Sequence, residues 1–203
     1  MDDDTTTRPK WKNSYSGISV LEAEKRLGFM MQTLDNEAIP VSEMLADAGY
    51  TIDESNEEIK KTKSEVYKAI LQYLDLEGYP TETNPEYNVS DLVLYILGPI
   101  VSYFKRKHIQ KGQNIRLRRE KEIVSVDGET GGKEKFVMID RVSVTERYFV
   151  LVIEAKRSSL GEAMKQCLLS MRDMQDGNGV GKVYGFITTG ESWQMVRYDG
   201  VSF

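Results

Sequence analysis

The sequence is poor in the two residues that bind soft metals and perform much of hydrolytic catalysis. Its 203 residues include one cysteine, Cys167, and one histidine, His108. A single cysteine excludes an internal disulfide and a zinc site built from several cysteines, and it suits a reducing compartment. A single histidine argues against a histidine-cluster metal site and against a Ser-His-Asp triad. The chemistry of this chain is therefore not expected to depend on His or Cys.

Long hydrophobic runs are also missing. The longest, LVLYILGPIVSYF at residues 92–104, is too short to span a bilayer and is interrupted by Gly98 and Pro99. The first residues, MDDDTTT, lack the basic flank and apolar core of a signal peptide. With 40% hydrophobic residues the chain can bury a sizeable core, as one domain or as a domain with an appendage. These features predict a soluble, intracellular protein, cytoplasmic or nuclear, without a membrane partner.

Positive charge is concentrated in one stretch although the net charge is -5. Residues 105–121, KRKHIQKGQNIRLRREK, contain a single acid, Glu120. Such a stripe can follow a phosphate backbone, which predicts nucleic acid, DNA or RNA, as a partner. The alternative is a solvated helix end and strand edge, where lysine deters edge-to-edge pairing. The candidate nucleic-acid-binding residues are Lys105, Arg106, Lys107, Lys111, Arg116, Arg118 and Arg119.

The first 80 residues are expected to form a flexible tail followed by helices. Residues 1–17 are polar and are interpreted as the tail. Residues 18–80 show helical spacing of apolar side chains, and we expect this region to cover the fold or to contact a protein partner or a second copy. The segment YPTETNPEYN, with two prolines, is a loop and the best domain boundary.

Residues 90–203 are predicted to form a second unit, a mixed α/β (α+β) domain. An apolar helix, kinked or restarted at Pro99, precedes three strands in which the pattern changes from helical to alternating. An amphipathic helix, LGEAMKQCLLSMRDM, and two short strands close the chain. The predicted order is αβββαββ, with a central mixed sheet. The third strand, RYFVLVIEAKR, is the most hydrophobic, so we expect it to be central.

Charged side chains end two of these strands. Glu154 and Lys156 are two residues apart on the third strand, so both point to one face. Asp140 ends the hydrophobic run FVMI on the strand before. Two carboxylates close together suit Mg²⁺ or Mn²⁺, and the carbonyl of Ala155 is a further candidate ligand. Antiparallel strands have their C-terminal ends at opposite edges, so a site with Asp140 and Glu154 requires a bent or splayed strand.

Asp140, a hairpin, and then Glu154-Ala155-Lys156 after a hydrophobic strand resemble the PD-(D/E)XK nuclease superfamily, which has the restriction-endonuclease-like fold. The final GFITTGESWQMVRYDG is similar to closing strands of some eukaryotic members, including Crinkler-like and mobile-element-associated nucleases. The resemblance implies a metal-dependent nuclease, with Asp140 and Glu154 as metal ligands. It also implies Lys156 as the catalytic lysine and Gln166 as a supporting residue on the next helix.

The sequence departs from the superfamily pattern at three points. Ile139 replaces the proline before the aspartate, and Ser170 replaces a tyrosine four residues after Gln166. The helix at residues 92–104 has no acid for a second metal. A second hypothesis therefore stays open, in which the same fold is catalytically inactive and binds nucleic acid or a partner protein, as an effector or complex subunit. A third is an unrelated α+β domain in which Asp140 and Glu154 are only edge charges.

Overall fold

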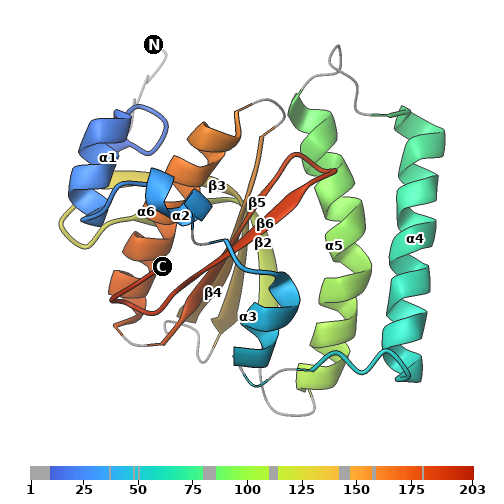
Figure 1. The fold of residues 1–203 in the computed structure, drawn as a ribbon. Coiled ribbons are helices and arrows are strands. Elements are labelled where there is room, and N and C mark those ends of the chain that lie inside the picture. The colour runs from blue at the N-terminus through green and yellow to red at the C-terminus, as the bar shows by residue number, and fades with distance from the viewer. Residues whose placement is uncertain are drawn as a thin grey trace, which may run out of the picture.

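The protein has a mixed α/β fold with one open mixed sheet and, in the described part, six helices (Figure 1). The computed structural model describes residues 10–36, 38–47, 49, 51–79, 86–109, 114–141, 147–156, 159–179 and 181–203. Helices cover both faces of the sheet (Figure 1). None of the helices in these ranges is long and apolar enough to cross a membrane.

Three short helices begin the chain and do not continue into one another. The first, α1 (Val20–Leu27), starts with a capping box in which Ser19 and Glu22 bond each other's backbone amides. It ends at Gly28, which has the left-handed conformation that glycine adopts at no steric cost (φ 87). Helices α2 (Gln32–Asn36) and α3 (Val41–Asp47) follow. The sequence pattern predicted one helical stretch over residues 19–34 and a separate short helix from Val41, and Gly28 divides the first of these into α1 and α2.

A helical hairpin forms one side of the molecule. Helix α4 (Glu57–Glu77) packs against α5 (Glu86–Ile109), and α5 lies between α4 and the sheet (Figure 1). Helix α5 therefore has partners on two sides, since Tyr95 meets Tyr73 of α4 while Val93 and Leu97 belong to the core under the sheet. Pro99 lies inside α5 and does not end it.

The sheet is built from six strands whose order places β4 in its middle. The strands are β1 (Asn13–Ser14), β2 (Ile115–Val124), β3 (Thr130–Arg141), β4 (Arg147–Ala155), β5 (Val183–Thr188) and β6 (Trp193–Tyr198). From β2 the order runs through β3, β4 and β5 to β6, and β4 pairs with β5 in parallel after the crossover helix α6 (Leu160–Asn178). The predicted central position of the third strand is confirmed.

Each face of the sheet carries its own core. One core lies under α6 and includes Val137, Val152, Cys167 and Leu168. The other lies under α5 and includes Phe136, Ile153 and Ala155. Alternation along β4 explains the division, because residues 152 and 153 point to opposite faces.

The described residues of the predicted N-terminal tail, 10–17, are docked on the sheet. Strand β1 pairs in parallel with Thr130 and Gly131 of β3. The Tyr15 side chain is buried and donates a hydrogen bond to Asp173 of α6 (2.8 Å). Tail formation was therefore the wrong expectation for residues 10–17; the polar composition concealed Trp11, Tyr15 and Ile18, which pack. The rest of the predicted tail, residues 1–9, lies outside the described residues.

Candidate active site

Asp140 is not close to Glu154. Asp140 pairs with Tyr148 at the beginning of β4, whereas Glu154 is at the end of that strand. Six residues of extended chain separate the two positions by about 20 Å. The carboxylate of Asp140 instead accepts a hydrogen bond from the backbone amide of Asn114 (3.1 Å). The bend that would have brought the two acids together does not occur, so the structure does not support Asp140 as a ligand beside Glu154.

The carboxyl that adjoins Glu154 is instead that of Glu134, an acid in the first half of β3. The register that joins Phe136 to Ile153 places the end of β4 against residues 134 and 135. Both glutamates are almost completely buried, with exposed fractions of 1% for Glu134 and 2% for Glu154. The two carboxyls are close enough for the charge of Glu154 and a hydrogen bond to it to raise the pKa of Glu134. We call these two residues the acid pair.

Glu134 lies near Cys167 of α6, whereas Phe136, two residues farther along β3, packs under α5. Gly132 faces Tyr15 in the core under α6, and simple alternation would place Phe136 on that side as well. Phe136 instead packs under α5. The alternation therefore changes phase once between Gly132 and Phe136. On the neighbouring strand, Glu120 has φ 48, an uncommon conformation for a residue other than glycine and typical of such irregularities.

Burial dominates the electrostatics of the acid pair. Desolvation raises the pKa of Glu134 well above the ordinary glutamate range, and the neighbouring charge of Glu154 raises it further. Desolvation also raises the pKa of Glu154, and the nearby Lys156 opposes this effect. The arrangement is that of a carboxyl pair sharing a proton, with Glu134 as the protonated member, because two like charges this close and this buried are unfavourable.

Two lysines lie next to the acid pair. The Lys156 ammonium is 3.8 Å from Oε1 of Glu154, and its side chain is 21% exposed. The Lys156 amide donates to the carbonyl of Thr188 (3.0 Å), so the backbone at this lysine is still held by β5. Lys135 lowers the pKa of Glu154 through its charge and a backbone hydrogen bond, and its ammonium pairs with Glu120 at 3.3 Å. The predicted proximity of Glu154 and Lys156 is therefore observed.

The acid pair has the chemistry to accept a hard divalent cation. Oε2 of Glu134 is buried and has no hydrogen-bond partner, which is costly for a carboxyl oxygen unless a proton or a cation occupies it. Carboxylate oxygens are the preferred ligands of Mg²⁺ and Mn²⁺. Ala155 packs its methyl group under α5, so only its carbonyl can contribute. No cluster of three or more His, Cys, Asp or Glu suited to a metal occurs in the described ranges, so the site offers two carboxylates.

Helix α6 closes the site from one face. Both glutamates raise the pKa of the buried Cys167 thiol, after desolvation, which places that thiol near the acid pair. Gln166 precedes Cys167 on this turn and is half-buried. Its supporting role stays a prediction.

The residues of the predicted nucleic-acid stripe differ in how much they are already engaged. Arg106, Lys107, Arg116, Arg118 and Arg119 are exposed, Lys105 is half-buried, and Lys111 lies outside the described residues. Arg119 is paired with Asp91 (3.3 Å) and lies over the Phe136 ring. Lys107 contacts the ring and hydroxyl of Tyr103, and Arg116 donates to the Asn114 side chain. The stripe therefore mixes engaged and solvent-facing cations.

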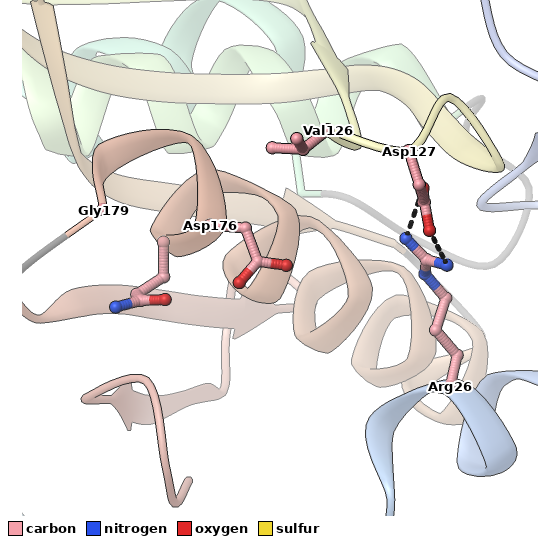
Figure 2. A pocket seen from close by; sticks show the side chains of 6 residues that line it. Arg26, Val126, Asp127, Asp176 and Gly179 are labelled. Atoms are coloured by element: carbon pink, nitrogen blue, oxygen red, sulfur yellow. Dashed lines mark hydrogen bonds and ion pairs between the residues drawn. The ribbon is translucent and has the colours of Figure 1, made fainter.

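A separate pocket of about 450 Å³ lies beside the C-terminal half of α6 (Figure 2). It is lined by Arg26, Val126, Asp127, Gln175, Asp176 and Gly179. The Arg26 guanidinium is bound by both oxygens of Asp127 at 3.0 Å and by the buried Asp173 at 3.3 Å. This pocket contains none of the residues that the sequence predicted for catalysis, and two of its charged lining residues, Arg26 and Asp127, are paired with each other.

Glu134 is the site residue that sequence reasoning missed. The segment DGETGGKE has the glycine-rich composition typical of a turn, whereas β3 already begins at Thr130. Antiparallel pairing was the signal that could have identified Glu134, because the end of one antiparallel strand faces the start of its partner. An acid near the start of β3, such as Glu134, can therefore adjoin Glu154, whereas an acid near its end, such as Asp140, cannot.

Comparison of the chain with family models, with curated proteins and with solved structures found no match.

Proposed function

We propose that this protein is a metal-dependent nuclease that hydrolyses phosphodiester bonds of DNA or RNA at the acid pair and Lys156. The observation that carries the proposal is the buried carboxyl pair next to a lysine, at the end of the central strand. Two adjoining carboxyls are rarely buried for structural reasons alone, because their desolvation costs much free energy unless a bound ligand compensates for it. In this proposal Glu134, and not Asp140, is the metal ligand from the strand that precedes Glu154.

The order of elements supports the same proposal. Helix α5, strands β2 to β4, helix α6 and strands β5 and β6 follow the order αβββαββ expected for a restriction-endonuclease-like core. The position of the acid pair at the end of the strand that carries Glu154-Ala155-Lys156 also supports the proposal. An acid supplied by β3, Glu134, then stands for the first acid of that motif, as a glutamate instead of an aspartate.

Each residue of the site has a distinct role in the proposed reaction. Glu134 and Glu154 would hold Mg²⁺ or Mn²⁺, with the Ala155 carbonyl as a further ligand. When bound, such a cation lowers the pKa of a water ligand and neutralises phosphate charge. Lys156 would orient the attacking water or stabilise the charge of the phosphorane-like transition state. Loss of the shared proton from the acid pair would accompany metal binding, since the ligands must be ionised.

The substrate would approach along the cationic side of β2 and the end of α5. Arg116 and Arg118 are exposed on β2, and Arg106 is exposed near the end of α5. Phosphate contacts of this kind position a nucleic acid without reading its sequence. They would add affinity that decreases as salt is raised.

The proposal is tested by incubating the purified protein with labelled DNA and RNA in Mn²⁺, Mg²⁺ or EDTA. Folded Glu154→Ala and Lys156→Ala variants are assayed beside it. We expect cleavage that requires a metal and is lost in both variants. Absence of cleavage on every substrate, together with no Mn²⁺ binding by calorimetry, would contradict the proposal and favour an inactive binding module.

A further inference from the structure

The N-terminal segment lies on the same edge of β3 as β4, and the acid pair is in the interval between them. Gly131 pairs with Ser14 of β1 and also with Val124 of β2, so β1 is on the edge opposite β2. Strand β4 is on that same edge, since residues 136–140 of β3 pair with both β4 and β2. Glu134 therefore follows the part of β3 held by β1 and precedes the part held by β4.

Residues 13–18, here called the clasp, are fixed at several points. The backbone amides of Asn13 and Tyr15 donate to the carbonyls of Glu129 and Gly131. At its far end, the carbonyl of Ile18 accepts a 2.7 Å hydrogen bond from the ammonium of Lys165, whose side chain is only 3% exposed. A buried lysine is costly, and its two partners are this carbonyl and Glu162 (2.8 Å). The clasp is therefore tied both to β3 and to α6.

The ring of Tyr15 covers the part of β3 that precedes Glu134. It covers Gly132, where an added Cβ would be 2.5 Å from the ring. Glu134 is two residues farther along β3, on the same face as Gly132, and its charge helps to raise the pKa of the Tyr15 hydroxyl. The Tyr15 hydroxyl points away to Asp173, which also accepts a 2.7 Å hydrogen bond from Thr130 on β3. Ring and hydroxyl thus join the start of β3 to α6.

We propose that the clasp completes the active site by holding Glu134 against Glu154, with the Tyr15 ring as the positioning group. The inference deepens the proposed function, because a ligand that must be oriented loses affinity when its support is removed. Gly131 and Gly132 suit this arrangement, since a side chain at either position would overlap Trp11 or Tyr15. The clasp therefore supports the active site in addition to stabilising the fold.

The test compares Tyr15→Ala, Tyr15→Phe and Lys165→Met with the unmodified full chain. Mn²⁺ affinity is measured by calorimetry, and hydrogen exchange is followed at the amides of residues 131–136. We expect Tyr15→Ala to weaken Mn²⁺ binding about tenfold or more and to accelerate exchange at these amides. Lys165→Met should have a smaller effect in the same direction. If Tyr15→Ala does not fold, Lys165→Met is the variant that tests the proposal. Tyr15→Phe keeps the ring and should retain the affinity.

Val196→Ala is the control for general destabilisation, because Val196 is buried on β6, three strands away from β3. It should lower stability and leave both readouts unchanged. Unaltered Mn²⁺ affinity and exchange in folded Tyr15→Ala and Lys165→Met would overturn the proposal, as would equal losses in Val196→Ala. If the unmodified protein binds no Mn²⁺, the proposed function fails, and local exchange at residues 131–136 alone decides whether the clasp holds Glu134.

Discussion

Glu134 lies against Glu154 because antiparallel pairing places the end of β4 beside the first half of β3. The two carboxyls are buried together, with Lys156 within 3.8 Å of Glu154. Because the two carboxyls are buried, ionisation of both is unfavourable unless a cation is bound between them. The same arrangement suits them to bind a cation. The following predictions depend on this relationship.

The stability of the metal-free protein should depend on the ionisation of Glu134. Its pKa is raised in the folded state, so folding binds a proton there more tightly than the unfolded chain does. The free energy of unfolding should therefore fall as the pH rises from the ordinary glutamate range through the raised pKa, by up to about 1.4 kcal/mol per pH unit for one proton. Glu134→Gln cannot ionise and should lessen this fall.

Urea denaturation in EDTA at several values between about pH 5 and about pH 8 measures the effect. Glu134→Gln should become more stable than the unmodified protein at the upper end. Glu122→Gln is the control, since Glu122 is a solvated glutamate on β2 whose pKa is lowered by Lys10. Parallel pH profiles for the unmodified protein and Glu134→Gln would be inconsistent with a protonated, buried Glu134.

Lys156→Met should separate catalysis from folding. Methionine keeps the aliphatic part of the side chain and removes the charge near Glu154. We expect cleavage to fall by about 100-fold or more, the usual cost of losing a group that stabilises transition-state charge. Lys133→Met, an exposed lysine on β3, should remain within about threefold of the unmodified rate. Similar rates for the two variants would remove Lys156 from the reaction.

Arg118 should contribute more to nucleic-acid binding than Arg119. Arg118 is exposed on β2, whereas Arg119 is engaged with Asp91 and the Phe136 ring. Arg118→Ala should weaken binding uniformly across sequences and reduce the salt slope by about 1. Fluorescence anisotropy in EDTA over a salt series gives both quantities. An unchanged slope in Arg118→Ala, or a larger loss in Arg119→Ala, would count against the proposed approach of the substrate.

Two glycines should respond to alanine in opposite directions. At Gly185 a Cβ would be 2.7 Å from Sγ of Cys167 and would also overlap Met171, so Gly185→Ala should destabilise the fold by about 1–3 kcal/mol. At Gly161, in the first turn of α6, nothing lies within 4 Å of the added Cβ. Gly161→Ala should stabilise by about 0.5–1 kcal/mol. Chemical denaturation compares them, and a neutral Gly185→Ala would contradict the packing of α6 on β5.

The elements with strong periodicity were predictable from the sequence. The strand ending in Glu154 and the helix after it appear as β4 and α6, because alternation and helical spacing reflect burial directly. The central position of β4 followed from its apolar composition. Helix α5 was also expected, although Pro99 proved compatible with an uninterrupted helix.

The first half of the site was not predictable in the same way. Adjacent glycines such as Gly131 and Gly132 are typical of a turn, whereas here they are strand residues on which Trp11 and Tyr15 pack. Glu134 stays on the face of Gly132, whereas Phe136 packs on the opposite face, so alternation counted back from Phe136 would not have placed Glu134 beside Glu154. The docking of residues 13–18 is a long-range contact of a polar segment, and local composition carries no sign of it.

Cleavage by Glu134→Gln and Asp140→Asn, assayed side by side with the unmodified protein in Mn²⁺, tests the central claim most directly. Both changes remove one carboxylate from β3, and only Glu134 adjoins Glu154. We predict metal-dependent cleavage that Glu134→Gln abolishes and that Asp140→Asn retains within about threefold. Loss of cleavage in Asp140→Asn with activity retained in Glu134→Gln would contradict the assignment of the acid pair as the active site.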